Sequence, residues 1–95
     1  MAMQTDVLST HLTASGDIDS GNRYRLKGVS YRGDGTNGYI KFRNGSASGD
    51  ILLELDVGTS DTFTIYLLIP GEGVLFSNGI YADVSHISAL TAFYG

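Results

Sequence analysis

Apolar side chains recur at every second position along much of this sequence, which is the pattern of strands that bury one face. In the run 39–43, Ile40 and Phe42 alternate with tyrosine and basic residues, and in the run 51–57 aliphatic residues occupy the odd positions. The intervening segment 44–50 is made of small and polar residues. The two runs are therefore predicted to pair as an antiparallel hairpin with an exposed loop.

Short runs of the same kind occupy most of the chain, and Asn-Gly pairs at 37–38, 44–45 and 78–79 supply residues that tolerate tight turns. The further runs are 6–13, 23–31, 63–69, 74–76, 80–84 and 87–94. No stretch has the spacing of an amphipathic helix with a cap. The pattern predicts an all-β fold: a single-domain antiparallel β-sandwich over residues 1–95, jelly-roll-like, with about eight short strands. Residues 1–22 are expected to form an N-terminal arm or an edge strand.

The predicted hairpin places charges of opposite sign on one outer face. Lys41 and Arg43 of its first strand fall on the same side as Glu54 and Asp56 of the second. Cross-strand pairs of this kind contribute about 0.2 to 1 kcal/mol each, so these charges are expected to set the register. In the run 23–31 the alternation slips at Gly28, which predicts a β-bulge.

Two runs are apolar on both faces, which a single sandwich interior does not bury. In 63–69 the odd positions are expected to face the core, leaving Tyr66 and Leu68 outside, and in 87–94 Ile87, Ala89 and Phe93 take the core face. The outer residues are covered by loops, are scattered exposed apolar side chains, or form a subunit interface. We favour the interface, which consists of Tyr66, Leu68, Leu90 and Tyr94. It predicts a symmetric homo-oligomer, with a trimer preferred.

The length and the net charge of the chain indicate which partners and which surroundings suit it. A 95-residue chain has a modest core, so burial against partner subunits would add to its stability. The net charge of −4, with only 6 lysines and arginines, argues against nucleic acid or an anionic membrane as partners. The longest apolar run, 65–69, is too short to span a bilayer, and the N-terminus has no signal-peptide pattern. A soluble protein is expected.

Candidate chemistry is sparse. Asp17 and Asp19 begin like a calcium loop, but Asn22 and Gly28 stand where the loop requires glycine and glutamate, so a polar turn is the better interpretation. The chain has no cysteine, its two histidines have no partners at a catalytic spacing, and no serine lies in a Gly-x-Ser-x-Gly motif. We therefore predict no enzyme activity, no metal and no cofactor.

Tyrosines leave a second function open, because exposed aromatic rings stack on sugars. Tyr31 and Tyr39 are the candidate stacking residues for a carbohydrate-binding β-sandwich module. Tyrosine is also an ordinary residue of strands, cores and interfaces, which is the simpler explanation of both positions.

The segments 67–76, 78–81 and 87–95 together resemble the C-terminal half of small β-rich proteins of tailed bacteriophages, including marine ones. The strand, Gly/Ser loop and aliphatic strand over 42–53 are also similar to that family. The resemblance implies a virion-associated structural protein, a decoration or fibre component. Its expected partners are its own copies and other virion proteins, and its expected location is the virion or the host cytoplasm during assembly. It carries no assigned site residues.

Overall fold

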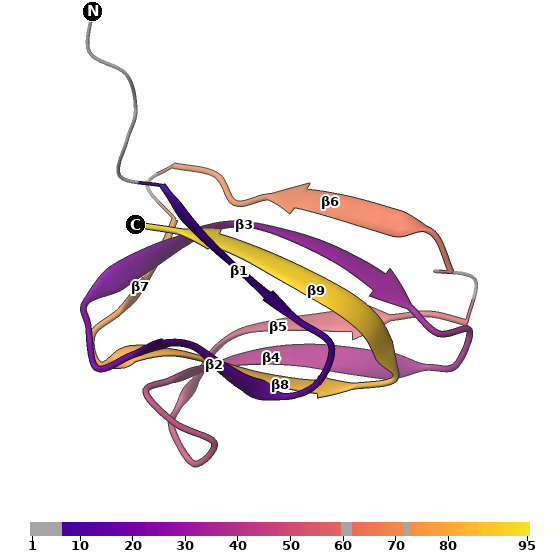
Figure 1. Ribbon diagram of the computed structural model, residues 1–95, viewed down its shortest axis with the longest axis horizontal. Helices are drawn as coiled ribbons and strands as arrows, with labels where there is room; N and C mark the ends of the chain where they lie inside the picture. The colour runs from indigo at the N-terminus through magenta and orange to yellow at the C-terminus, as the bar shows by residue number, and fades with distance from the viewer. Residues whose placement is uncertain (1–6, 60–61, 72) are drawn as a thin grey trace, which may run out of the picture.

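The computed structural model describes residues 7–59, 62–71 and 73–95, which form nine β-strands and no helix. The strands are β1 (Leu8–Leu12), β2 (Gly16–Ser20), β3 (Tyr24–Gly33), β4 (Gly38–Asn44), β5 (Ile51–Val57), β6 (Thr64–Leu68), β7 (Val74–Phe76), β8 (Gly79–Ser85) and β9 (Ile87–Tyr94). They stack as two antiparallel layers, seen one above the other in Figure 1. The predicted antiparallel β-sandwich is confirmed, with nine strands where about eight were expected.

The strand pairings are nested. Sheet A has the order β1-β9-β3-β6, with β7 also paired to β3, and sheet B has the order β2-β8-β4-β5. Thus β1 pairs with β9, β2 with β8, β3 with β6, and β4 with β5. In the segment 1–22, where an arm or an edge strand was expected, β1 lies at the edge of sheet A and β2 at the edge of sheet B. Residues 1–6 of the expected arm lie outside the described residues.

The hairpin predicted around the loop 44–50 is β4 paired with β5, and Lys41 stands opposite Glu54 as expected. The ion pair that forms, however, reaches the other neighbour of β4. Arg43 Nε lies 3.2 Å from the Asp83 carboxylate on β8, which sequence alternation within the hairpin does not reveal. The bulge predicted at Gly28 is confirmed by a register shift between Leu26 and Gly28 against β9.

The core lies between the two sheets and is almost entirely apolar. Its largest fully buried side chains are Phe42, Phe76, Leu26, Ile40, Ile80, Leu90 and Val29. Among the described residues that are fully part of the core, Tyr94 alone has a polar side-chain group. Its hydroxyl lies 2.8 Å from Thr10 Oγ1 and donates to the Ile18 carbonyl at 3.3 Å. Ile18 belongs to β2, so this hydroxyl joins strands of sheet A to sheet B.

Candidate functional site

Two of the four residues predicted to form an interface lie on the surface, and two do not. Tyr66 and Leu68 of β6 are 61% and 68% exposed. Leu90 and Tyr94 of β9 are only 1% and 6% exposed, because they face the core of the same chain. The prediction of one surface that contains all four residues is therefore wrong.

The prediction interchanged the buried and the outer face of the last strand, β9. Leu90, Ala92 and Tyr94 point inward, and it is Phe93 that shares the outer face with Tyr66. Alternation alone does not say which of two apolar sets enters the core. The set that contains Tyr94 is the buried one, and its hydroxyl has two hydrogen-bond partners there, one from β1 and one from β2.

An apolar hollow of about 420 Å³ opens on the outer face of sheet A. Residues that line it include Val7, Gly28, Tyr66, Leu68, Pro70 and Phe93. At its floor Gly28 has no side chain, and the rings of Tyr66 and Phe93 approach above it with centroids 6.0 Å apart at 75°. A Cβ on Gly28 would lie only 3.3 Å from the Leu67 carbonyl oxygen, whereas the Tyr66 hydroxyl oxygen and Phe93 Cδ2, at 3.5 and 3.8 Å, would be in ordinary contact, so it is the close approach of the β6 backbone that favours glycine here.

Sequence reasoning identified Tyr66 and Leu68 but missed the rest of this hollow. Alternation in the last strand predicts that Phe93 faces the core, whereas it lies on the outer face beside Tyr66. Val7 lies just before the first strand, so alternation within a strand does not place it. The usable signal was Gly28, since a glycine inside a strand marks a place where another group approaches closely.

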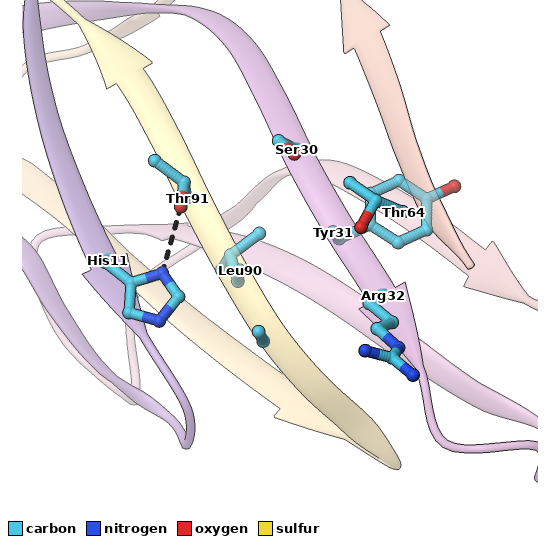
Figure 2. A pocket seen from close by; sticks show the side chains of 8 residues that line it. His11, Ser30, Tyr31, Arg32, Thr64, Leu90 and Thr91 are labelled. Carbon is cyan, nitrogen blue, oxygen red and sulfur yellow. Dashed lines mark hydrogen bonds between the residues drawn. The ribbon is translucent and has the colours of Figure 1, made fainter. Parts of the chain in front are cut away.

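A second, polar hollow of about 240 Å³ lies on the same face of sheet A, and Figure 2 shows the side chains that line it. Along β6, its Thr64 lies on the other side of Tyr66 from Leu68. Its lining includes His11, Ser30, Tyr31, Arg32, Thr64 and Thr91. His11 Nδ1 and Thr91 Oγ1 are 3.0 Å apart, and the Arg32 Nε donates to the Thr62 carbonyl at 3.0 Å. The small residues of its lining are Ser30 on β3, Thr64 on β6, and Ala89 and Thr91 on β9.

Charge is divided unequally between the two sheets. The strands of sheet A contain three basic residues, Arg25, Lys27 and Arg32, and no aspartate or glutamate. The strands of sheet B contain two basic residues and five acidic ones, which are Asp17, Asp19, Glu54, Asp56 and Asp83. Although the chain as a whole has a net charge of −4, the strands of sheet A contain no carboxylate.

The two tyrosines considered for sugar stacking do not form one platform. Tyr31 belongs to sheet A, where it packs against the core and lines one side of the polar hollow. Tyr39 belongs to sheet B, and Lys41 Nζ lies 4.3 Å from the centroid of its ring.

The remaining titratable groups form pairs rather than clusters. His86 Nδ1 lies 3.2 Å from the Asp34 carboxylate, and both side chains are exposed at the surface. Asp19 accepts hydrogen bonds from the backbone and side-chain nitrogens of Asn22, in the turn that follows β2. Among the described residues, no three His, Cys, Asp or Glu side chains come together as a metal site requires. The same residues include no helix that is long and apolar enough to cross a membrane.

Comparison with family models, with curated proteins and with solved structures finds no match to this chain.

Proposed function

We propose that this protein is a structural, non-enzymatic component that assembles into a symmetric homo-oligomer through the apolar hollow of sheet A. The observation that carries the proposal is the exposure of Tyr66 and Leu68 beside Phe93 on a sheet face whose strands contain no carboxylate. Contiguous exposed apolar residues of this kind mark interaction surfaces. The outer face of sheet B, with five acidic residues on its strands, is instead suited to water.

A second copy of the chain is the proposed occupant of the apolar hollow, with a trimer as the preferred assembly. The hollow is rich in aromatic and aliphatic side chains, and Tyr66 and Phe93 are residue types enriched at the centres of interfaces. A chain of 95 residues has a small core, so burial of these side chains between subunits adds to the stability of each subunit.

The proposed setting is a virion of the tailed-phage type, as a decoration or fibre component, or the host cytoplasm during assembly. The nested strand pairing supports a jelly-roll topology, because with β7 set aside the first strand pairs with the last and each next strand with the next from the end. Jelly rolls build many viral capsid proteins and lectins, and this analogy of fold is the support for the setting.

Size-exclusion chromatography with light scattering tests the interface. The wild-type mass should correspond to an oligomer, and Leu68→Asp should shift it to the monomer because a carboxylate is then buried without a partner. Leu52→Asp is the matched control, since Leu52 is 40% exposed on β5 at the edge of sheet B. It should leave the mass unchanged.

Two results would contradict the proposal. One is a wild-type monomer at all concentrations up to about 1 mM, which leaves less than about 4 kcal/mol of association free energy. The other is an oligomer that Leu68→Asp leaves intact while Leu52→Asp dissociates it, which would move the interface to sheet B.

A further inference from the structure

The polar hollow on sheet A differs from the apolar hollow in its chemistry. Ser30, Thr64 and Thr91 contribute hydroxyl groups to its lining, which also includes Tyr31, His11 and Arg32. Ser30 and His11 both stand opposite Thr91, and Arg32 stands opposite Thr64, so these groups form two neighbouring rows across four strands. Adjacent strands are about 4.8 Å apart, so His11 on β1 and Arg32 on β3 belong to strands roughly 10 Å apart, a distance that one sugar ring with hydrogen bonds at both ends can span. We propose that this hollow binds a sugar unit that carries a carboxylate, such as a uronic acid.

Arg32 supplies the group that would hold the carboxylate. Its Nε donates to the Thr62 carbonyl at 3.0 Å, which fixes the guanidinium at the mouth of the hollow. Within the described parts of the chain, its two terminal nitrogens form no hydrogen bond or ion pair. A guanidinium held in this way presents parallel N–H donors, the geometry that binds a carboxylate with two hydrogen bonds.

His11 and Thr91 supply polar groups at the opposite end. Their ring nitrogen and hydroxyl are 3.0 Å apart, so each orients the other, and the second ring nitrogen of His11 remains for a ligand (Figure 2). Whichever group donates in this pair, the other ring nitrogen of a neutral histidine is the complementary donor or acceptor. Sugar hydroxyls both donate and accept, so they match either arrangement.

Among the residues that the structure describes, the charged groups that line the hollow favour an anion over a neutral sugar. No strand of sheet A contains a carboxylate that would compete for Arg32. The nearest acidic residue along β3, Asp34, follows the strand and is engaged by His86 and by the Thr36 amide. One guanidinium among several hydroxyls suits a singly charged carboxylate on a ring with hydroxyls. A phosphate is usually held by several cations or by clustered backbone amides.

The volume of the hollow limits the ligand to a single unit. Sites for drug-sized molecules occupy about 300 to 1,000 Å³, and this hollow measures about 240 Å³. The site therefore fits one residue of a larger acidic glycan. A single sugar making these few contacts is expected to bind with a dissociation constant of about 1 mM.

Titration by NMR, with the full chain and D-glucuronate as the probe, tests the proposal. Amide signals of Ser30, Arg32, Ala89 and Thr91 should shift and saturate, whereas D-glucose and acetate at equal concentration should bind at least about tenfold more weakly. Arg32→Gln should weaken glucuronate binding about tenfold or more. Thr91→Val, which keeps the side-chain shape, should weaken it about twofold to tenfold.

Arg25→Gln is the matched control, because Arg25 is a cation of the same strand that does not line the hollow. It should leave the affinity unchanged. Leu68→Asp should also bind glucuronate normally, so failure of the oligomer and failure of the sugar site give different results. Spectra of each free variant confirm that it is folded.

Several outcomes would overturn the proposal. Absence of saturable shifts at about 10 mM glucuronate excludes the site, since that is ten times the expected dissociation constant. Equal binding of glucose shows that the carboxylate is not recognised, and equal binding of acetate shows that the sugar ring is not. Tighter binding of inorganic phosphate identifies a general anion site, and unchanged affinity in both Arg32→Gln and Thr91→Val places the ligand elsewhere.

Discussion

At the scale of single residues, Tyr94 carries the one polar side-chain group among the described residues of the core. It lies 2.8 Å from Thr10 Oγ1 and 3.3 Å from the Ile18 carbonyl oxygen inside the core. We expect Tyr94→Phe to lower the free energy of unfolding by about 0.5 to 1.5 kcal/mol, measured by urea denaturation. The loss should fall toward the lower end, because Thr10 Oγ1 lies 3.2 Å from the same carbonyl and still satisfies it.

Tyr66→Phe is the control for this prediction. Tyr66 is 61% exposed, so its hydroxyl is hydrated in the folded and the unfolded chain, and its removal should change the free energy of unfolding by less than about 0.5 kcal/mol. Equal effects of the two substitutions would show that the buried hydrogen bonds of Tyr94 contribute nothing to stability.

At the scale of strands, the pair of Arg43 on β4 with Asp83 on β8 fastens two central strands of sheet B. The two charged atoms are 3.2 Å apart, and the side chains are only 21% and 29% exposed. We expect Asp83→Asn to lower the free energy of unfolding by about 0.5 to 1 kcal/mol. A double-mutant cycle with Arg43→Gln should give a coupling free energy of similar size. A coupling free energy near zero would show that the two side chains lie close together without stabilising the fold.

The turn between β7 and β8 depends on Gly79, which has a φ of 106°. A Cβ at this position would lie 2.5 Å from the Asp19 carbonyl oxygen. Gly79→Ala therefore combines backbone strain with a collision and should cost more than about 3 kcal/mol of unfolding free energy. Gly21→Ala is the control, because Gly21 has a φ of 84° and no atom within 4 Å of its Cβ position. Strain alone should cost about 1 to 2 kcal/mol there, and equal losses at both sites would exclude the collision.

At the scale of the whole molecule, the two sheets differ in charge. If copies meet through the apolar hollow of sheet A, the Arg25 side chains of neighbouring subunits approach one another, with no carboxylate on the strands of this sheet to offset their charge. Salt screens this repulsion, since the Debye length falls from about 30 Å at 0.01 M to about 3 Å at 1 M. We therefore expect the subunit dissociation constant, measured by analytical ultracentrifugation, to decrease as sodium chloride increases.

The opposite salt dependence would identify a different assembly. If the basic face of sheet A met the acidic face of sheet B on the next copy, salt would screen an attraction and raise the dissociation constant. Asp56→Asn, on β5 at the edge of sheet B, distinguishes the two arrangements, because it should affect the dissociation constant only in the second.

The sequence by itself determined most of the elements of this protein. The exception is β2, because the segment that starts at Asp17 was predicted to be a polar turn, whereas Gly16–Ser20 form a strand and the turn begins after it. Alternation and Asn-Gly turns are local properties, so they were enough to predict an antiparallel sandwich, the β4–β5 hairpin and the bulge at Gly28. They also identified Tyr66 and Leu68 as outer residues, because both alternate with the aliphatic residues of β6 that face inward.

Only the tertiary structure decided which side of β9 is buried and which residues share a hollow. Both faces of that strand are apolar, so the choice depends on partners distant in the chain, such as Thr10 and Ile18 for Tyr94. The polar hollow likewise joins side chains of β1, β3, β6 and β9, and its residues carry no common motif. Periodicity reports the two faces of one strand, whereas burial and site geometry arise from pairing between strands that are far apart in sequence.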